Sequence, residues 1–194
     1  MEPSESKSET FSWLTNKTFL SVFGTLFALV FIVLLILINV ATHVEDIEEK
    51  LKYIPPQTEE SEIPKESVFA EHTIYVPVYS HIYSQGGKPL LLETTLSVRN
   101  SDPSKEITIN AIRYYNTNGK LMKNYLQKPL RLKPFATAEF LVEQENIKGG
   151  SGANFIVDWV SKTKVNNPVI EAVMVGIEDR VSISFVRPGI AIEK

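Results

Sequence analysis

The chain of 194 residues contains no cysteine. Disulfide bonds, zinc sites with thiolate ligands, blue-copper centres and cysteine nucleophiles are therefore excluded. The absence is compatible with a secreted or periplasmic domain that depends on its hydrophobic core for stability. Any chemistry of the chain has to come from other side chains.

Charged residues are also absent from one long stretch: no Asp, Glu, Lys or Arg occurs between Phe19 and Val40. A helix over this stretch would be about 33 Å long at about 1.5 Å per residue, enough to cross a bilayer's hydrocarbon core. A buried helix of a soluble protein would show a polar stripe, and this segment shows none. The sequence predicts a single transmembrane helix at residues 19–41 that contacts the lipid bilayer. The apolar run is longer than a typical signal-peptide core, which favours an uncleaved anchor.

The two flanks of this segment differ in charge. Residues 1–18 are polar and rich in Ser, Thr and Glu, which predicts a disordered arm. Lysines are equally frequent on both sides, but Lys17 lies nearest to the segment. The residues that follow the segment are acidic: Glu45, Asp46, Glu48 and Glu49. We therefore expect a cytoplasmic N-terminus and an exported C-terminal domain, periplasmic or extracellular.

Residues 42–67 predict an acidic helical stalk followed by a linker. Apolar residues recur there with a 3-4-3 spacing, at Val44, Ile47, Leu51 and Ile54. This is the seam of a coiled coil, but it is shorter than the three or four heptads that define one. Two interpretations remain: a weak homo-oligomer through the stalk, or a helix that only continues out of the membrane. Pro55 and Pro56 would end the helix in either case.

Helical periodicity is missing from Val68 onward, where apolar and polar residues alternate. Eight or nine short strands with intervening turn signals predict an all-β domain over residues 68–194, an antiparallel immunoglobulin-like β-sandwich. No crossover helices are available for a three-layer α/β fold, while a small barrel remains an alternative. A slip of apolar phase between Ile109 and Ile112 predicts a bulge. Asn118-Gly119 predicts a tight hairpin with positive φ at both residues.

The alternation also predicts which side chains face the core. The expected inward residues are Leu92, Leu96, Val98, Ala138, Phe140, Val142, Val181, Ile183 and Phe185. Glu93, Ser97 and Arg99 are expected to face water. Two segments, FIVDWV and PVIEAVMVGI, are apolar on both faces, which predicts central strands with Trp159 and Met174 in the core.

The stretch from Ile74 to Tyr83 is predicted as one strand, placed at an edge or bulged because Pro77 cannot donate a ladder hydrogen bond. Ring side chains on one side of it form a candidate interaction face, comprising Tyr75, Tyr79, His81 and Tyr83. Such a face would offer large contact area beside an open edge. Alternatively, this face packs on the second sheet, since tyrosine is often half-buried.

Positive charge is concentrated in one run of the domain. Residues 68–194 carry fifteen Lys and Arg against twelve Asp and Glu, whereas residues 1–67 carry five against eleven. The run forms a candidate basic patch: Lys120, Lys123, Lys128, Arg131 and Lys133. It would attract anionic lipid headgroups, a cell-wall polymer or the acidic stalk, or it is simply a solvated face. No basic stripe typical of a nucleic-acid-binding surface is present.

Catalytic signatures are lacking. His72 and His81 would be roughly 30 Å apart along an extended strand and on different faces, which argues against a shared metal ion. The glycine-rich loop at residues 149–152 lacks the Gly-Lys-Ser/Thr of a phosphate-binding loop and precedes a strand. Asp158 lies between apolar residues, so a salt bridge or turn contact is expected for it. The sequence predicts no enzyme, no metal and no cofactor.

Seven segments of the domain carry a resemblance: YVPVYSHIY at 75–83, LSVRNSDP at 96–103, RYYNTNGKL at 113–121, LKPFATAEFLVE at 132–143, GGSGANFIVDW at 149–159, EAVMVGI at 171–177 and ISF at 183–185. In this order they resemble a bacterial family, the domain of unknown function 3124 (DUF3124) family. The resemblance implies a bacterial, often membrane-anchored or exported protein, and no catalytic or ligand residues. The arm, the anchor and the stalk lie outside it.

We therefore expect a membrane-tethered, non-enzymatic β-sandwich of the bacterial inner membrane that serves as a protein-interaction or envelope assembly module. The alternative is a sensor or carrier of a small ligand or envelope polymer, and a hydrolase is the third class. A deep pocket with convergent polar groups would favour the latter two. An exposed apolar and aromatic patch would favour the interaction module.

Overall fold

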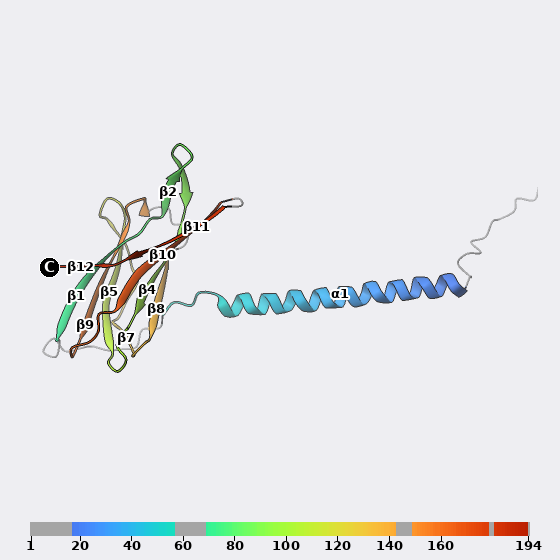
Figure 1. The fold of residues 1–194 in the computed structure, drawn as a ribbon, viewed down its shortest axis with the longest axis horizontal. Coiled ribbons are helices and arrows are strands. Elements are labelled where there is room, and N and C mark those ends of the chain that lie inside the picture. Colours follow the sequence, from blue (N-terminus) through green and yellow to red (C-terminus); the bar gives the residue numbers. More distant parts are fainter. Residues whose placement is uncertain (1–16, 57–68, 143–148, 179–180, 194) are drawn as a thin grey trace, which may run out of the picture. The chain divides into compact units, whose positions relative to one another are not determined.

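A computed structural model describes residues 17–56, 69–142, 149–178 and 181–193. The chain forms two compact units, Met1–Tyr53 and Ile54–Lys194. In the described residues the first unit holds one helix and the second holds twelve strands (Figure 1).

Helix α1 spans Lys17–Leu51. Its segment Phe19–Thr42 has a mean hydropathy of 3.0 and none of it is buried inside the structure, so by length and composition it could cross a membrane. The hydroxyls of Thr25 and Thr42 donate to the carbonyls of Val22 and Asn39, at 2.8 and 2.9 Å. These bonds within the helix leave neither hydroxyl in need of water.

The helix ends at Leu51, so Ile54 of the predicted apolar seam lies beyond it. Pro55 explains this, because a proline disfavours the helical conformation of the residue before it. Ile54 is exposed. The side chains of residues 43–51 and the linker at residues 57–67 lie outside the described residues, so stalk oligomerisation stays a prediction.

Two antiparallel sheets make up most of the second unit (Figure 1). The six-stranded sheet has the order β12-β1-β9-β5-β6, with β7 also paired to β5. Its strands are β1 Ala70–Pro77, β5 Ile107–Tyr115, β6 Leu121–Asn124, β7 Leu130–Leu132, β9 Asn154–Ser161 and β12 Ile190–Ile192. The four-stranded sheet has the order β11-β10-β4-β8. Its strands are β4 Glu93–Arg99, β8 Thr137–Val142, β10 Val169–Glu178 and β11 Val181–Pro188.

A separate hairpin joins β2 His81–Ser84 to β3 Lys88–Leu91. In Figure 1 it projects from the end of the domain opposite β7. Its turn uses left-handed backbone at Gln85, Gly86 and Gly87.

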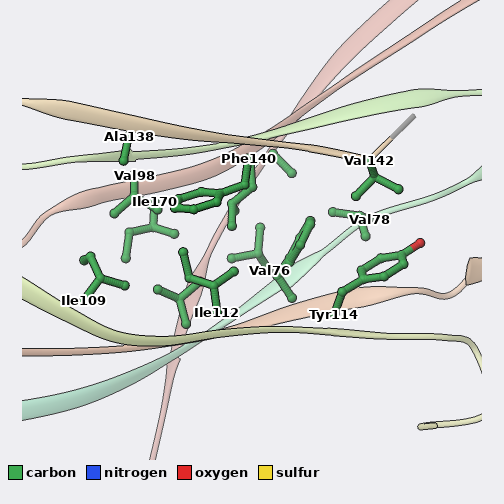
Figure 2. Close-up of a cluster of buried hydrophobic side chains, with 14 of the residues drawn as sticks. Val76, Val78, Val98, Ile109, Ile112, Tyr114, Ala138, Phe140, Val142 and Ile170 are labelled. Carbon is green, nitrogen blue, oxygen red and sulfur yellow. The ribbon is translucent and has the colours of Figure 1, made fainter. Parts of the chain in front are cut away.

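One hydrophobic core lies between the two large sheets (Figure 2). In Figure 2, Val98 and Phe140 of the four-stranded sheet point toward Val76 and Ile112 of the six-stranded sheet. All four are at most 2% exposed. Each fully buried side chain of this size stabilises the fold by about 1.5–3 kcal/mol.

Most inward predictions are confirmed. Leu92, Leu96, Val98, Ala138, Phe140, Val142, Trp159 and Met174 are buried, and Ile183 and Phe185 pack against the core. The two doubly apolar segments are the central strands β9 and β10. The side chain of Val181 lies outside the described residues.

Ser97 is a correction, because it is only 1% exposed instead of facing water. It does lie on the outer side of β4, opposite the core residues Leu96 and Val98. However, Arg99 covers it: the Arg99 Nε donates to Ser97 Oγ at 3.0 Å and its guanidinium pairs with Glu171 at 3.4 Å.

The predicted strand from Ile74 to Tyr83 is also corrected, since it breaks into β1 and β2. Between them Val78 and Ser80 donate their backbone N–H groups to Ala153 and Gly150, which pulls the chain away from a straight path. Pro77 ends β1, beyond the three residues that pair with β12. β1 is therefore covered by β12 only at residues 73–75. Pro77 lies beyond this paired part, where its missing N–H interrupts no hydrogen bond to β12.

The predicted bulge is confirmed by a register shift between Ile109 and Ala111. The Asn118-Gly119 turn differs from the prediction, because only Gly119 has positive φ, at 73°. Asn116 closes this turn instead: its side-chain oxygen accepts the N–H groups of Asn118 and Lys120, at 3.0 and 2.9 Å. A side-chain cap of this kind removes the need for left-handed backbone at both central residues.

Candidate interaction face

The predicted aromatic set does not form a single face, because the chain breaks after β1. Tyr75 lies on the outer side of β1 and is half-buried. Tyr79 packs against the core, with its ring centroid 5.9 Å from that of Phe185 and the Arg187 guanidinium 6.0 Å from the ring. The structure therefore separates Tyr79 from Tyr75.

His81 and Tyr83 lie together on the β2–β3 hairpin. Their rings are edge to face at 5.1 Å, and His81 Nε2 is 3.2 Å from the Tyr83 hydroxyl. Tyr83 is 64% exposed. These two residues form a small polar and aromatic spot, apart from Tyr75.

Tyr75 instead belongs to the outer surface of the six-stranded sheet. Val76 and Val157 are completely buried, so their neighbours Tyr75 and Ile156 must point to the opposite side. Residues that face each other in register share that side. The outer surface, here called the Tyr75 face, consists of Thr73, Tyr75, Pro77, Ala111, Arg113, Tyr115, Leu121, Asn124, Asn154, Ile156, Asp158, Ile190 and Ile192.

The Tyr75 face exposes large aliphatic side chains on the solvent side of an antiparallel sheet, a side that is typically polar. Leu121, Ile190 and Ile192 are 48%, 61% and 43% exposed. Tyr75 and Ile156 follow Ile190 in register and are half-buried. The face thus combines aliphatic residues and two tyrosines with five polar residues, across β12, β1, β9, β5 and β6.

One ion pair lies within the Tyr75 face. The Arg113 guanidinium donates to Asp158 at 2.5 Å, and Thr73 Oγ1 donates to the other carboxylate oxygen at 2.6 Å. The side chains of Arg113 and Asp158 are 33% and 14% exposed. The predicted salt bridge of Asp158 is therefore confirmed, and Arg113 Nε has no hydrogen-bond partner in the described structure.

The bulge in β5 creates this ion pair. Without the extra residue at the register shift, Arg113 would point to the core side and Ile112 to the outer side. With it, Ile112 and Tyr114 are buried and Arg113 comes within reach of Asp158. The phase slip was visible in the sequence, but its partner on β9 was not.

The outer surface of the four-stranded sheet also mixes polar and aliphatic residues. Its polar members are Glu93, Thr95, Arg99, Thr137, Glu139, Glu171 and Ser184. Its aliphatic members are Leu141, Val169, Val173, Val175, Ile177 and Val186, of which Ile177 and Val186 are 67% and 48% exposed. Both outer surfaces therefore expose aliphatic side chains, and the Tyr75 face is distinguished by Tyr75, Tyr115 and the ion pair of Arg113 with Asp158.

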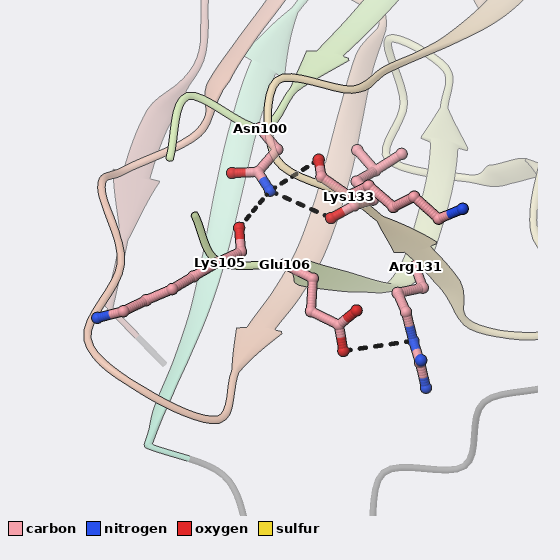
Figure 3. Close-up of polar contacts among 6 residues, drawn as sticks. Asn100, Lys105, Glu106, Arg131 and Lys133 are labelled. Atoms are coloured by element: carbon pink, nitrogen blue, oxygen red, sulfur yellow. Dashed lines mark hydrogen bonds and ion pairs between the residues drawn. The ribbon is translucent and has the colours of Figure 1, made fainter. Parts of the chain in front are cut away.

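The basic residues predicted as a patch are spread along one edge of the six-stranded sheet. β6 pairs with the end of β5, and β7 with its beginning. Lys123 lies 4.3 Å from the ring centroid of Tyr125, and Arg131 pairs with Glu106 at 3.6 Å (Figure 3). Lys120, Lys128 and Lys133 are exposed. Charges on edge strands discourage pairing with other chains, which accounts for this row.

The glycine-rich loop has a packing role. A Cβ on Gly149 would collide with the hydroxyl of Tyr114, whose burial raises its pKa. Thr117 donates to the Gly149 carbonyl at 3.1 Å and accepts from the Gly152 N–H at 3.0 Å. The loop is therefore fastened to the end of β5 and does not form a phosphate cradle.

Neither His72 nor His81 belongs to a metal-binding cluster among the described residues. His72 stacks on Trp159 across the sheet, with ring centroids 4.7 Å apart. It also lines a cavity of about 410 Å³ with residues of β12, next to the Tyr75 face.

Sequence reasoning missed the contribution of β12 to this face. Ile190 and Ile192 belong to a strand of only three residues, which is too short for an alternation pattern to reveal. Gly189 immediately before it was the available signal, because glycine often marks a sharp bend between strands.

Comparison with known proteins gives a family and one structural similarity. A family model described as "Protein of unknown function (DUF3124)" matches residues 71–192. A solved structure from Thermotoga maritima, titled "Crystal Structure of Thermotoga maritima 1070", is similar with a TM-score of 0.38 and 9% sequence identity, over 61% of this chain and 92% of that chain. No curated protein matches.

Proposed function

Because the chain belongs to the DUF3124 family through residues 71–192, we propose that its function resides in the β domain and depends on the Tyr75 face. The protein is a single-pass, membrane-tethered module outside the bacterial cytoplasm. It is non-enzymatic and binds a protein partner whose contact surface is apolar. The observation that carries this proposal is the outer surface of the six-stranded sheet, where exposed aliphatic residues lie beside Tyr75, Tyr115 and the ion pair of Arg113 with Asp158.

The tether is supported by helix α1. Its apolar segment is long enough to span a bilayer, and no part of it packs on protein. The hydroxyls of Thr25 and Thr42 bond within the helix, as a lipid environment requires. The residue nearest the N-terminal end is Lys17, while the sequence after the apolar segment is acidic, which supports an exported domain.

The immunoglobulin-like part of the fold is also a proposal. The neighbours β4 and β8, and the row β9-β5-β6, match the B-E and F-C-C′ neighbours of an immunoglobulin domain. The outer strands differ, because β1 lies beside β9 and β10 lies beside β4. In an immunoglobulin domain the first strand pairs with strand B, and the last strand pairs with strand F. Here β1 pairs with β9, which takes the place of F, and β10 pairs with β4, which takes the place of B. The positions of these two outer strands are therefore exchanged.

An interface role accounts for the composition of the Tyr75 face. Monomeric soluble proteins rarely expose large contiguous apolar surfaces, and interface centres are rich in aromatic residues and arginine. Arg113 is already oriented by Asp158, and its side chain is 33% exposed. A partner that covers Tyr75 and Ile190 would bury apolar area, and an acceptor on it would meet the exposed part of an arginine whose position is already fixed.

The test is site-specific crosslinking from the full chain in intact membranes. A photoreactive residue replacing Leu121 is expected to form a discrete protein adduct. Ile190→Lys, at the other side of the same face, is expected to abolish the adduct because it places a charge in the apolar contact. Ile190 is 61% exposed, so unfolding stability should change by no more than about 0.5 kcal/mol.

Val186 supplies the matched control, because it is 48% exposed on β11 of the other sheet. Val186→Lys should leave the adduct unchanged, and a photoreactive residue at position 186 should give none. An adduct that survives Ile190→Lys would overturn the proposal. An adduct of twice the mass of the chain would identify the partner as a second copy.

A further inference from the structure

One end of the domain gathers exposed aromatic and basic side chains from four separate segments. We call it the lysine end, formed by Phe69, Lys105, Lys133, Phe135, Lys162 and Lys164. Residues 104–106, Pro134 and residues 160–163 line one cavity there, of about 340 Å³. The N–H of Phe69 donates to the Ser161 carbonyl at 2.8 Å, which places the first described residue of the domain at the same end.

Hydrogen bonds hold these segments together. The side-chain amide of Asn100 donates to the carbonyls of Lys105 and Lys133, at 2.8 and 3.0 Å (Figure 3). Lys105 Nζ in turn donates to the Lys164 carbonyl at 2.7 Å. These hydrogen bonds fix the positions of the loops of the lysine end relative to one another.

Its net charge is positive. The segments at residues 100–106, 131–136 and 161–168 carry five Lys and Arg against two acidic residues. Both acids are already engaged. Glu106 pairs with Arg131, and Asp102 accepts backbone N–H groups of Ser104, Lys105 and Asn166. Lys133, Lys162 and Lys164 form no ion pair with the described residues, so their charge is available to an anionic surface.

Phe135 is the most unusual residue of this end. Its φ is 58°, in the left-handed region that a bulky side chain rarely adopts, and 70% of it is exposed. It follows Pro134 in a turn closed by a bond of 3.0 Å from the Ala136 N–H to the Lys133 carbonyl, where glycine would be favoured. A strained aromatic side chain that contributes little to the core points to a role outside the fold.

We propose that the lysine end docks on the surface of an anionic bilayer. Phe69 and Phe135 enter the headgroup level, and the lysines contact lipid phosphates. Ser161, only 2% exposed and without a hydrogen-bond partner for its hydroxyl in the described structure, lines the cavity and supplies a further donor for a phosphate oxygen. The inference rests on the proposed membrane tether, which keeps the domain within reach of a lipid surface.

The absence of cysteine makes a direct test available. Thr163→Cys carries an environment-sensitive fluorophore at the rim of the lysine end, and Lys88→Cys carries it on the distant hairpin. The full chain is reconstituted in bilayers of phosphatidylcholine alone or mixed with phosphatidylglycerol. We expect the label at position 163 to be shielded from water only in the anionic bilayer, and high salt to reverse this shielding. The label at position 88 should stay exposed to water in both bilayers.

Two variants separate docking from folding. Phe135→Gly should abolish most of the shielding while leaving the domain as stable or more stable, because glycine adopts the left-handed region without strain. Lys162→Glu should lower the ratio of docked to undocked label by at least about fivefold, since each surface lysine contributes about that factor. Lys120→Glu, on a separate hairpin turn, serves as the charge-matched control and should have little effect.

The outcomes are distinguishable. Shielding that is equal in neutral and anionic bilayers, or that survives Phe135→Gly, would overturn the inference. Displacement by inorganic phosphate but not by chloride at the same ionic strength would make this end a phosphate-binding pocket and overturn docking. Dissociation of the full chain from neutral bilayers would refute the tether. The shielding measured with anionic bilayers would still decide whether the lysine end binds lipid.

Discussion

At the scale of single residues, Asp102 shows how one carboxylate closes a loop. Its oxygens accept the backbone N–H of Ser104 at 3.0 Å, of Asn166 at 3.0 Å and of Lys105 at 2.9 Å. The bonds from Ser104 and Asn166 lower the pKa of Asp102 below its ordinary value, because they favour the charged form. The carboxylate thereby joins two loops that are far apart in the sequence.

This pKa shift predicts a pH dependence of stability. Since the folded state lowers the pKa, the stabilisation by Asp102 is complete above its unfolded value of about 3.9 and is lost as the pH falls through the folded value. Asp102→Asn should therefore melt below the native chain at pH 7, with the gap in melting temperature narrowing below about pH 4. Glu93→Gln, an exposed control, should show no such narrowing. A constant gap down to pH 3 would contradict the assignment.

Residue-level prediction from sequence succeeded where one strand decided the outcome. Phe140 and Val98 were placed in the core by alternation alone, and Asp158 was given an ion partner because an isolated charge between apolar neighbours is costly. It failed where the path of a single long side chain decides. Ser97 lies on the outer side of β4 as predicted, but Arg99, two residues along the same strand, covers it. Alternation says which side of a strand a residue faces and not which neighbour covers it there.

At the scale of elements, the most consequential feature is the passage of the chain from β11 to β12. β11 pairs in the four-stranded sheet and β12 in the six-stranded sheet, with Gly189 between them. The Gly189 N–H donates to the Ile170 carbonyl at 2.8 Å. This crossing brings Ile190 and Ile192 onto the Tyr75 face, so the face depends on the glycine.

Gly189→Ala should destabilise the domain. An added Cβ would collide with Ile74 and approach the Ile170 carbonyl to 3.0 Å and Val76 to 3.1 Å. Overpacking of this kind typically costs about 1–3 kcal/mol. Thermal unfolding and faster amide exchange in β12 would report it. Gly152→Ala, whose Cβ would first meet the end of Thr117 at 3.3 Å, should cost much less. Equal losses in the two variants would remove the special role of Gly189.

Elements were predictable to different degrees for a physical reason. The bulge in β5 and the central places of β9 and β10 follow from apolar pattern within each segment. The break between β1 and β2 depends on hydrogen bonds to residues 150 and 153, at least seventy positions away in the sequence. The candidate face was consequently found only at Tyr75, because its other members are brought there by pairing that no local pattern encodes.

At the scale of the whole molecule, the two units divide the physical tasks. The segment Phe19–Thr42 of the helical unit is apolar and has no buried contact, while the β domain has its own core and matches the family over residues 71–192. Two surfaces of the domain then differ in chemistry. We propose an apolar protein partner for the Tyr75 face and an anionic surface for the lysine end. Both proposals require that the domain lie on a definite side of the membrane.

That side can be predicted from charge around the apolar segment. Lys17 and the N-terminal amine precede it, whereas Glu45, Asp46, Glu48 and Glu49 follow it closely. Positive charge is retained in the cytoplasm, so the domain should be exported. In a chain without native cysteine, a single Lys88→Cys on the exposed hairpin should react with a membrane-impermeant maleimide added to cells whose outer barrier has been opened.

A cysteine in the arm, at Ser4, should react only after the inner membrane is permeabilised. The ratio of the two labelling yields before and after permeabilisation gives the topology without a fusion partner that could perturb it. The reverse pattern would place the domain in the cytoplasm and exclude an envelope partner for the Tyr75 face. Loss of the Ser4 label from a shortened, soluble chain would show instead that the apolar segment is removed as a signal sequence, which would refute the tether.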